Sequence, residues 1–128
     1  MKKLLCLLLL CLMVIGCSSE KINGEKLYKQ IEAPLAYEFV SNEKAILIDV
    51  RSLKEYEQGH IENAINIPFD TITKEILENV TNSNIDNIIV YCQSGTRSKK
   101  AAIKIIEFGY TNVYDLGSIE EWNKINEK

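Results

Sequence analysis

The chain has 128 residues, of which 46% are hydrophobic and 26% are charged, and its formal charge at neutral pH is −3. This length allows one domain with an ordinary core and leaves no room for two independent cores. The composition is typical of a globular protein and excludes a disordered or fibrous one. The acidic balance gives no sign of a basic surface that would bind nucleic acid.

The first part of the chain is typical of an export signal. Two lysines precede an unbroken apolar run over residues 4–15, and Gly16, Cys17 and polar residues follow. The run is shorter than the roughly 20 residues of a membrane-spanning helix, so we expect this segment to be cleaved.

Residues 14–17, VIGC, resemble the bacterial lipobox, in which a peptidase cuts before a lipid-modified cysteine. The resemblance implies that residues 1–16 are a lipoprotein signal peptide and that Cys17 carries diacylglycerol, with fatty acids such as palmitate. Residues 17–26 would then be a lipidated N-terminus and short tether, and residues 27–128 a folded domain. The protein would be anchored to a membrane of the cell envelope, facing the periplasm or the outer surface. The alternative is an ordinary signal peptide in which Cys17 occurs by chance.

Cys92 would be the free thiol of the mature chain. Of the four cysteines, Cys6 and Cys11 lie in the predicted signal peptide and Cys17 would be blocked by lipid. A single thiol cannot form an internal disulfide, and an odd cysteine in an exported protein is a candidate reactive group.

The first half of the expected domain contains three predicted strands. Residues 28–31 form a short strand, Pro34 opens a helix through residue 41, and the apolar run over residues 45–50 is a buried strand. Ser52 and Glu55 then form a capping box that begins a short helix. A third strand follows over residues 64–67.

The second half continues the alternation of helices and strands. Thr71 is predicted to cap a helix over residues 72–80, and residues 87–91 form another buried strand. A helix over residues 98–108 ends at Gly109, and a strand over residues 112–116 precedes a final helix opened by a capping box of Ser118 and Glu121. This alternation predicts an α/β fold with a parallel sheet of about five strands and helices on both faces.

Residues 92–98, CQSGTRS, form the most distinctive loop of the chain. Cys92 is predicted to be the first residue after a strand, and the next helix begins near Ser98. In α/β sheets, ligands usually bind where strands end and helices begin. Backbone NH groups, the helix N-terminus and Arg97 would all favour a negative charge on the sulfur, and Gly95 permits a tight loop. The alternative is a buried structural cysteine.

Three motifs resemble those of the rhodanese family of sulfurtransferases. CQSGTRS matches the family's active loop, whose pattern is Cys, two residues, Gly, one residue, Arg, then Ser or Ala. Residues 47–68, LIDVRSLKEYEQGHIENAINIP, are similar to its upstream signature. Residues 116–122, LGSIEEW, resemble its closing motif, although Ser118 stands where the family usually has a second glycine. The match covers roughly residues 27–125 and implies a rhodanese-like parallel sheet.

The resemblance also implies a mechanism. Cys92 would take the outer sulfur of a small donor such as thiosulfate, hold it as a persulfide, and pass it to an acceptor such as cyanide or a thiol. The implied binding loop comprises Gln93, Ser94, Gly95, Thr96, Arg97 and Ser98, and Asp49 and Arg51 would support it. No metal or organic cofactor is needed, and we expect a monomer that does not bind nucleic acid.

Two further residues have competing interpretations. His60, the single histidine of the chain, could serve as a general base for Cys92, but in rhodaneses the GHI motif to which it belongs is structural, so a supporting role is expected. Glu55 is explained by the capping box. Asp49 and Arg51 could also contact the substrate directly instead of supporting the loop.

Other functions fit the sequence less well. Phosphatases and arsenate reductases carry five residues between the loop cysteine and arginine, whereas this chain carries four, a smaller ring that suits sulfur better than phosphate. A thiol-disulfide oxidoreductase would need a second cysteine. A non-catalytic rhodanese-like binding module at the cell surface is the alternative from another class, and such modules often lack the cysteine.

Overall fold

The structure is a computed structural model that describes residues 27–127. The predicted signal peptide, the predicted lipidation site at Cys17 and the predicted tether lie outside the described residues. Within residues 27–127, no helix combines the length and the apolar character that crossing a bilayer requires.

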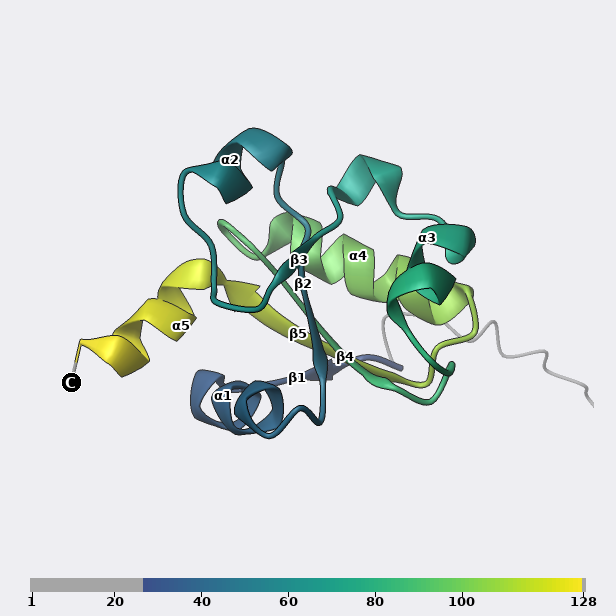
Figure 1. Cartoon of the computed structure of the whole chain (residues 1–128), viewed down its shortest axis with the longest axis horizontal. Coiled ribbons are helices and arrows are strands. Elements are labelled where there is room, and N and C mark those ends of the chain that lie inside the picture. Colours follow the sequence, from purple (N-terminus) through teal and green to yellow (C-terminus); the bar gives the residue numbers. More distant parts are fainter. Residues whose placement is uncertain (1–26, 128) are drawn as a thin grey trace, which may run out of the picture.

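Five parallel strands form one sheet (Figure 1). The strands are β1 (Lys29–Gln30), β2 (Ile46–Asp49), β3 (Ile65–Asn66), β4 (Asn87–Cys92) and β5 (Asn112–Ser118). Their order across the sheet is β1-β5-β4-β2-β3, so the longest two strands lie side by side at its centre. The predicted α/β class and the expected number of strands are confirmed.

Helices cover both faces of this sheet, as predicted (Figure 1). They are α1 (Ala33–Ser41), α2 (Leu53–Glu57), α3 (Lys74–Val80), α4 (Thr96–Glu107) and α5 (Ile119–Asn126), with a 3₁₀-helix, η2 (Phe69–Thr71), before α3. α3 and α4 pack on one face, and α1 and α5 pack on the other.

The core consists of two apolar layers, one on each face of the sheet. Side chains alternate between the faces along each strand, and both layers are apolar because both faces are covered. One layer joins β2, β4 and α4 through Ile48, Val90 and Ile105. The other joins β2, β4 and α5 through Leu47, Ile89 and Trp122. The central strands are therefore buried on both sides, which explains their unbroken apolar runs.

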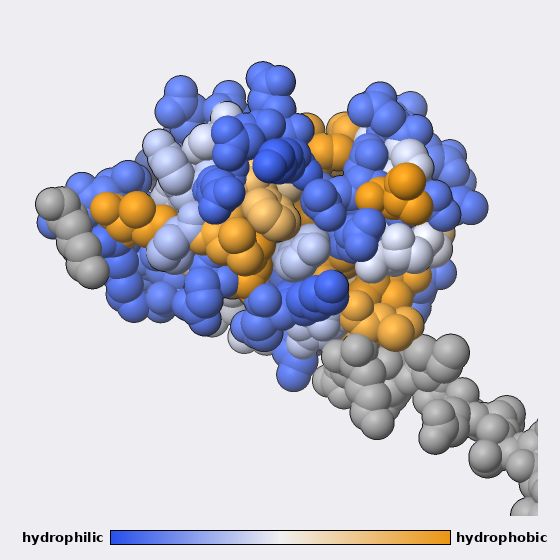
Figure 2. Space-filling model, turned by 90° about the horizontal axis from the view of Figure 1, so that it is seen from below, coloured by the Kyte–Doolittle hydropathy of each residue, from blue (hydrophilic) through white to orange (hydrophobic). Residues whose placement is uncertain are grey.

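Some apolar surface remains exposed on α1. Figure 2 views the molecule from below and shows apolar side chains gathered over this helix. Leu35 and Tyr37 of α1 are about half exposed. The Tyr37 ring also packs on Trp122 of α5, with ring centroids 5.6 Å apart. Tyr37 therefore closes the outer edge of the contact between the two helices.

The predicted start of α3 is wrong by two residues. Thr73, not Thr71, caps this helix, because the Thr73 hydroxyl accepts a hydrogen bond from the Ile76 NH (3.2 Å). The Thr71 hydroxyl instead donates to the Pro68 carbonyl (2.8 Å) and closes the 3₁₀-helix. The sequence alone does not show which of the two threonines caps the helix. The 3₁₀-helix after Pro68 uses Thr71, so Thr73 becomes the cap of α3.

The boundaries around the cysteine loop also differ from the prediction. Cys92 is the last residue of β4 and not the first after it, because β5 continues to Ser118 and pairs with Cys92 there. α4 begins at Thr96, two residues before Ser98, because Gly95 at its N-cap has a left-handed φ of 94°. The loop between strand and helix is therefore only three residues long, from Gln93 to Gly95.

The start of α5 agrees only in part with the predicted capping box. The Ser118 hydroxyl accepts a hydrogen bond from the Glu120 NH (3.2 Å) and so caps the helix. The Glu121 carboxylate does not complete the box and instead accepts a hydrogen bond from Lys124 Nζ (2.7 Å). A serine cap is sufficient to begin this helix.

Candidate active site

The carboxyl ends of β2 and β4 meet at a switch point of the sheet. The chain passes from β2 outward to β3 on one side, and from β4 to β5 on the other. Ligands of open α/β sheets bind at such points, where the connections diverge. β2 ends at Asp49 and β4 ends at Cys92, so the topology brings the two candidate motifs to one place.

The Cys92 sulfur is held by backbone NH groups. Sγ accepts hydrogen bonds from the Gly95 NH (3.0 Å) and the Ser98 NH (3.3 Å), which belong to the loop and the first turn of α4. Cys92 is fully buried in the structure. The two NH donors lie at the N-terminus of the 12-residue helix α4, whose positive end would stabilise negative charge that develops on the sulfur. Of the predicted loop residues, Gly95 and Ser98 therefore contact the sulfur through their backbone NH groups.

The loop backbone is fixed from both sides. Ser98 Oγ donates to the Gly95 carbonyl (3.1 Å), and Ser118 Oγ donates to the Gln93 carbonyl (2.7 Å). A Cβ added to Gly95 would lie 3.7 Å from Gly117 Cα, so the loop rests on the end of β5. The side chains of Gln93, Ser94 and Thr96 are exposed. The loop therefore combines a rigid backbone with three uncharged side chains that face solvent.

Asp49 and Arg51 form a buried ion pair beside the loop. Arg51 Nη2 lies 2.7 Å from Asp49 Oδ2, and the two side chains are 5% and 0% exposed. The Arg51 Nε and backbone NH also donate to Asp49, and the side-chain hydrogen bond with Asp49, with its charge second, raises the pKa of Arg51. Arg51 Nη1 lies 3.4 Å from Gln93 Oε1. This geometry suits the supporting position that the sequence predicts for the pair.

Tyr91 and Gly59 extend the network around this ion pair. The Tyr91 hydroxyl donates to Asp49 Oδ2 (2.7 Å) and accepts from the Ile61 NH (3.1 Å). Burial raises the pKa of Tyr91. Arg51 Nη2 also donates to the Gly59 carbonyl (2.7 Å), so the segment that leads to His60 is attached to β2. Sequence reasoning missed Tyr91, because a tyrosine at the end of an apolar strand gives no sign of its hydrogen bonds.

Arg97 pairs with Glu55 of α2. Arg97 Nη1 and Nη2 donate to the two Glu55 carboxylate oxygens at 2.8 and 2.9 Å, a bidentate arrangement. The predicted capping box of Ser52 and Glu55 is confirmed. The hydrogen bond from Arg97, with the Ser52 NH second, lowers the pKa of Glu55 to about 2. Sequence reasoning did not foresee this pair, because its members are 42 residues apart.

A second buried carboxylate, Asp115 of β5, lies next to the loop. Sequence reasoning missed this residue. It is 3% exposed and accepts hydrogen bonds from the Gly117 NH (2.9 Å) and Gln30 Nε2 (3.4 Å). Burial raises the pKa of Asp115, and the neighbouring Ser98 side chain opposes that rise. The available signal was an acidic residue within the strand predicted over residues 112–116. Asp115 therefore lies beside the first turn of α4 and hydrogen-bonds to the end of β5.

His60 lies on the surface, away from the hydrogen bonds of the sulfur. Its Nδ1 is 2.9 Å from the Tyr56 carbonyl oxygen, and its ring stacks on the Tyr56 ring with centroids 3.6 Å apart. These contacts suit a supporting role for His60 better than general-base catalysis at Cys92.

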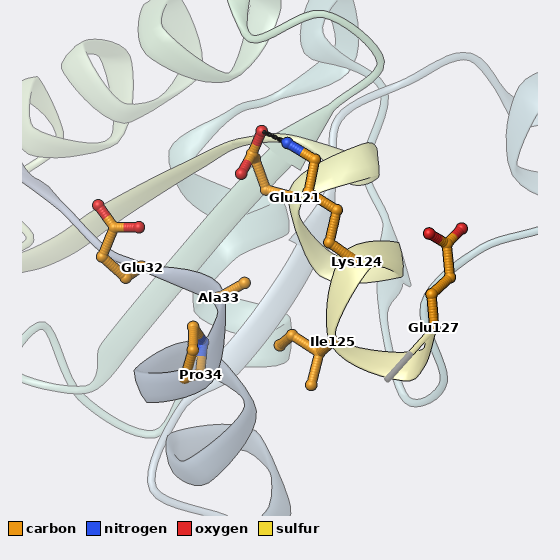
Figure 3. A pocket seen from close by; sticks show the side chains of 7 residues that line it. All are labelled: Glu32, Ala33, Pro34, Glu121, Lys124, Ile125 and Glu127. Atoms are coloured by element: carbon orange, nitrogen blue, oxygen red, sulfur yellow. Dashed lines mark hydrogen bonds and ion pairs between the residues drawn. The ribbon is translucent and has the colours of Figure 1, made fainter.

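A separate hollow lies between the first turn of α1 and α5 (Figure 3). It encloses about 540 Å³, and none of its seven lining residues belongs to the cysteine loop. Its Lys124 is paired with Glu121, and its lining residues include no nucleophile beyond that amine.

Within residues 27–127, no group of three or more His, Cys, Asp or Glu side chains could hold a metal ion. The loop around Cys92 is thus the candidate active site.

Comparison with known proteins shows which family the sequence resembles. The family model described as the rhodanese-like domain matches residues 32–125. The tRNA uridine(34) hydroxylase of Photorhabdus laumondii is 31% identical over 118 residues, which cover 88% of this chain and 34% of that protein. The enzyme of the same name from Yersinia pestis is 28% identical, with coverages of 88% and 33%. The chain therefore spans about a third of the length of the curated relatives it matches.

Solved structures share the fold. A rhodanese with anions from E. coli is 35% identical, with a TM-score of 0.54, covering 60% of this chain and 89% of that one. A Bacillus halodurans protein is 29% identical, with a TM-score of 0.67 and coverages of 80% and 76%. A human single-domain sulfurtransferase, at 24% identity, has a TM-score of 0.64 and coverages of 74% and 95%, a likeness of fold alone.

Proposed function

The chain belongs to the rhodanese-like domain family, and on this premise we propose that it is a sulfurtransferase that carries sulfane sulfur as a persulfide on Cys92. The donor is thiosulfate or a related compound, and the acceptor is a thiol or cyanide. The observation that carries the proposal is the Cys92 sulfur held by the Gly95 and Ser98 NH groups at the start of α4.

The reaction has two steps. The Cys92 thiolate attacks the outer sulfur of thiosulfate, the sulfur–sulfur bond of the donor breaks, and sulfite leaves with the bonding electron pair. The product is an anionic persulfide on Cys92. Cyanide or a thiolate then attacks the outer sulfur, and the Cys92 thiolate is released. Each step exchanges one sulfur bond for another, so no external oxidant or reductant takes part.

The loop residues divide this work. The Gly95 and Ser98 NH groups stabilise the anionic sulfur before and after loading. Gln93, Ser94 and Thr96 are exposed and would contact the donor as it arrives. Arg97 would lie beside the arriving donor, and its guanidinium is shared with Glu55. Asp49 and Arg51 act as positioning residues beneath the loop.

Sulfur loading provides the direct test. The chain from Ser18 onward, in which Cys92 is the sole cysteine, would be incubated with thiosulfate and its intact mass measured. We expect a gain of one sulfur atom that disappears on addition of cyanide, with an equal amount of thiocyanate formed. A folded protein with a reduced thiol that gains no sulfur from thiosulfate or from an organic persulfide would contradict the proposal.

The tRNA-directed activity named for the longer relatives is not part of this proposal. This chain spans about a third of those proteins. It also has a formal charge of −3, which does not favour binding to the phosphates of a nucleic acid. The proposed substrates are therefore small molecules. We also propose that the protein acts as a monomer.

Lipid anchoring through Cys17 is a further part of the proposal, and it rests on the lipobox-like residues 14–17. The full chain expressed in bacteria should fractionate with membranes, and its intact mass should show a chain beginning at Cys17 with diacylglycerol and a fatty acid such as palmitate. Cys17→Ser should remove the added lipid mass. A wild-type chain whose intact mass shows no added lipid, as in the Cys17→Ser variant, would contradict lipidation.

A further inference from the structure

Both arginines beside the loop have carboxylate partners within the protein. Arg51 is buried against Asp49, at 2.7 Å. Arg97 forms its bidentate pair with Glu55, and these two side chains are 36% and 32% exposed. The loop side chains of Gln93, Ser94 and Thr96 carry no charge. A donor that approaches Arg97 therefore meets a guanidinium whose charge Glu55 already balances.

Glu55 is itself held in place by the start of α2. Its Oε2 accepts hydrogen bonds from the Ser52 NH and Ser52 Oγ, both at 2.9 Å. The Glu55 NH donates back to Ser52 Oγ (3.2 Å). Movement of the carboxylate away from Arg97 would therefore also break the capping box. An anionic donor that displaced Glu55 would therefore have to break both the ion pair with Arg97 and the hydrogen bonds with Ser52.

We propose that Glu55 determines the charge of the preferred sulfur donor, an inference that rests on the proposed sulfurtransferase function. By balancing Arg97, Glu55 disfavours thiosulfate, which carries two negative charges, and favours persulfides of small organic thiols, whose sulfur–sulfur group carries at most one. In that reaction the Cys92 thiolate attacks the outer sulfur of the protonated form, R–S–SH, the donor sulfur–sulfur bond breaks, and R–S⁻ leaves. The outer sulfur keeps its proton, and charge and electrons balance.

A matched pair of alkylating reagents measures this effect without any sulfur transfer. Iodoacetate is an anion, iodoacetamide is neutral, and the two have nearly the same size and the same leaving group. Both must reach the same buried sulfur of Cys92, so the ratio of their rates reports the electrostatic potential there and not the burial. The rates would be followed by intact mass in the chain from Ser18 onward, where Cys92 is the sole cysteine.

Glu55→Gln is the test variant and Glu57→Gln is its control. Glutamine can still complete the capping box, so α2 should persist in the first variant. Glu57 is an exposed residue at the end of the same helix, and its replacement changes the formal charge by the same amount. We expect the rate ratio of iodoacetate to iodoacetamide to rise about five- to tenfold in Glu55→Gln and less than about twofold in Glu57→Gln, because a unit charge acts mainly at short range.

The second readout is the choice of donor. In Glu55→Gln, kcat/KM for thiosulfate should rise relative to kcat/KM for the persulfide of 2-mercaptoethanol by a similar factor. An unchanged alkylation ratio in Glu55→Gln, or an equal rise in both variants, would overturn the inference about Glu55. If the alkylation ratio changes as expected but no donor loads sulfur, the electrostatic role of Glu55 stands and the proposed sulfur transfer fails.

Discussion

Replacement of Cys92 by serine is expected to reduce thiocyanate formation from thiosulfate and cyanide by at least about 10³-fold, the scale of loss when a catalytic nucleophile is removed. A serine hydroxyl is a much weaker nucleophile toward sulfur than a thiolate. The hydroxyl can still accept hydrogen bonds from the Gly95 and Ser98 NH groups, so the loop should keep its shape. Steady-state thiocyanate production at matched protein concentration is the measurement.

Ser41→Ala is the control for this variant, because Ser41 is an exposed residue at the end of α1. Its activity should equal that of the wild type. Urea denaturation should show that Cys92→Ser is folded under the assay conditions. A folded Cys92→Ser protein that kept more than about a hundredth of the wild-type rate would exclude covalent catalysis by this cysteine.

The largest loss of stability is expected for Asp49→Ala. This change leaves the Arg51 guanidinium, whose side chain is 5% exposed, buried without its carboxylate. It also removes the acceptor of the Tyr91 hydroxyl. Breaking a buried ion pair from one side costs about 3–5 kcal/mol. Since small domains have unfolding free energies of about 5–15 kcal/mol, much of the stability would be lost.

Urea unfolding at neutral pH would measure this loss, with Glu78→Ala as the control. Glu78 is paired with Lys74 at 3.9 Å on the surface, and both side chains are 58% exposed. Removal of such an exposed partner should change the free energy of unfolding by less than about 0.5 kcal/mol. An Asp49→Ala protein within about 1 kcal/mol of the wild type would show that the buried pair is not a major support of the fold.

Local patterns predicted most of the fold. The apolar runs that became β2 and β4 identify buried strands because both faces of the sheet are covered. Ser52 and Glu55 predict the start of α2, and Gly109, with a φ of 100°, marks the end of α4. Each of these signals acts over a few residues. The position of Cys92 at a strand end next to a helix could therefore be predicted without coordinates.

Partners that are distant in the chain could not be predicted in the same way. The contact between Arg97 and Glu55 spans 42 residues, and nothing near Glu55 shows that a capping carboxylate also binds the loop. The side chain of Asp115 lies against Gln30, 85 residues earlier in the chain. Such pairs depend on which strands become neighbours, and that follows from the order of strands in the sheet, not from local sequence.

The end of β5 has a consequence for any transfer of this loop to another protein. β5 contains an irregularity in its pairing, where Val90 pairs with Asp115 but Tyr91 pairs with Gly117. This offset of one residue places Gly117 against Gly95, and Ser118 against the Gln93 carbonyl. Residues 92–98 are thus one half of a unit whose other half is residues 115–118. A graft of the loop alone onto a regular strand would lack its supports, so a designed scaffold must receive both segments together.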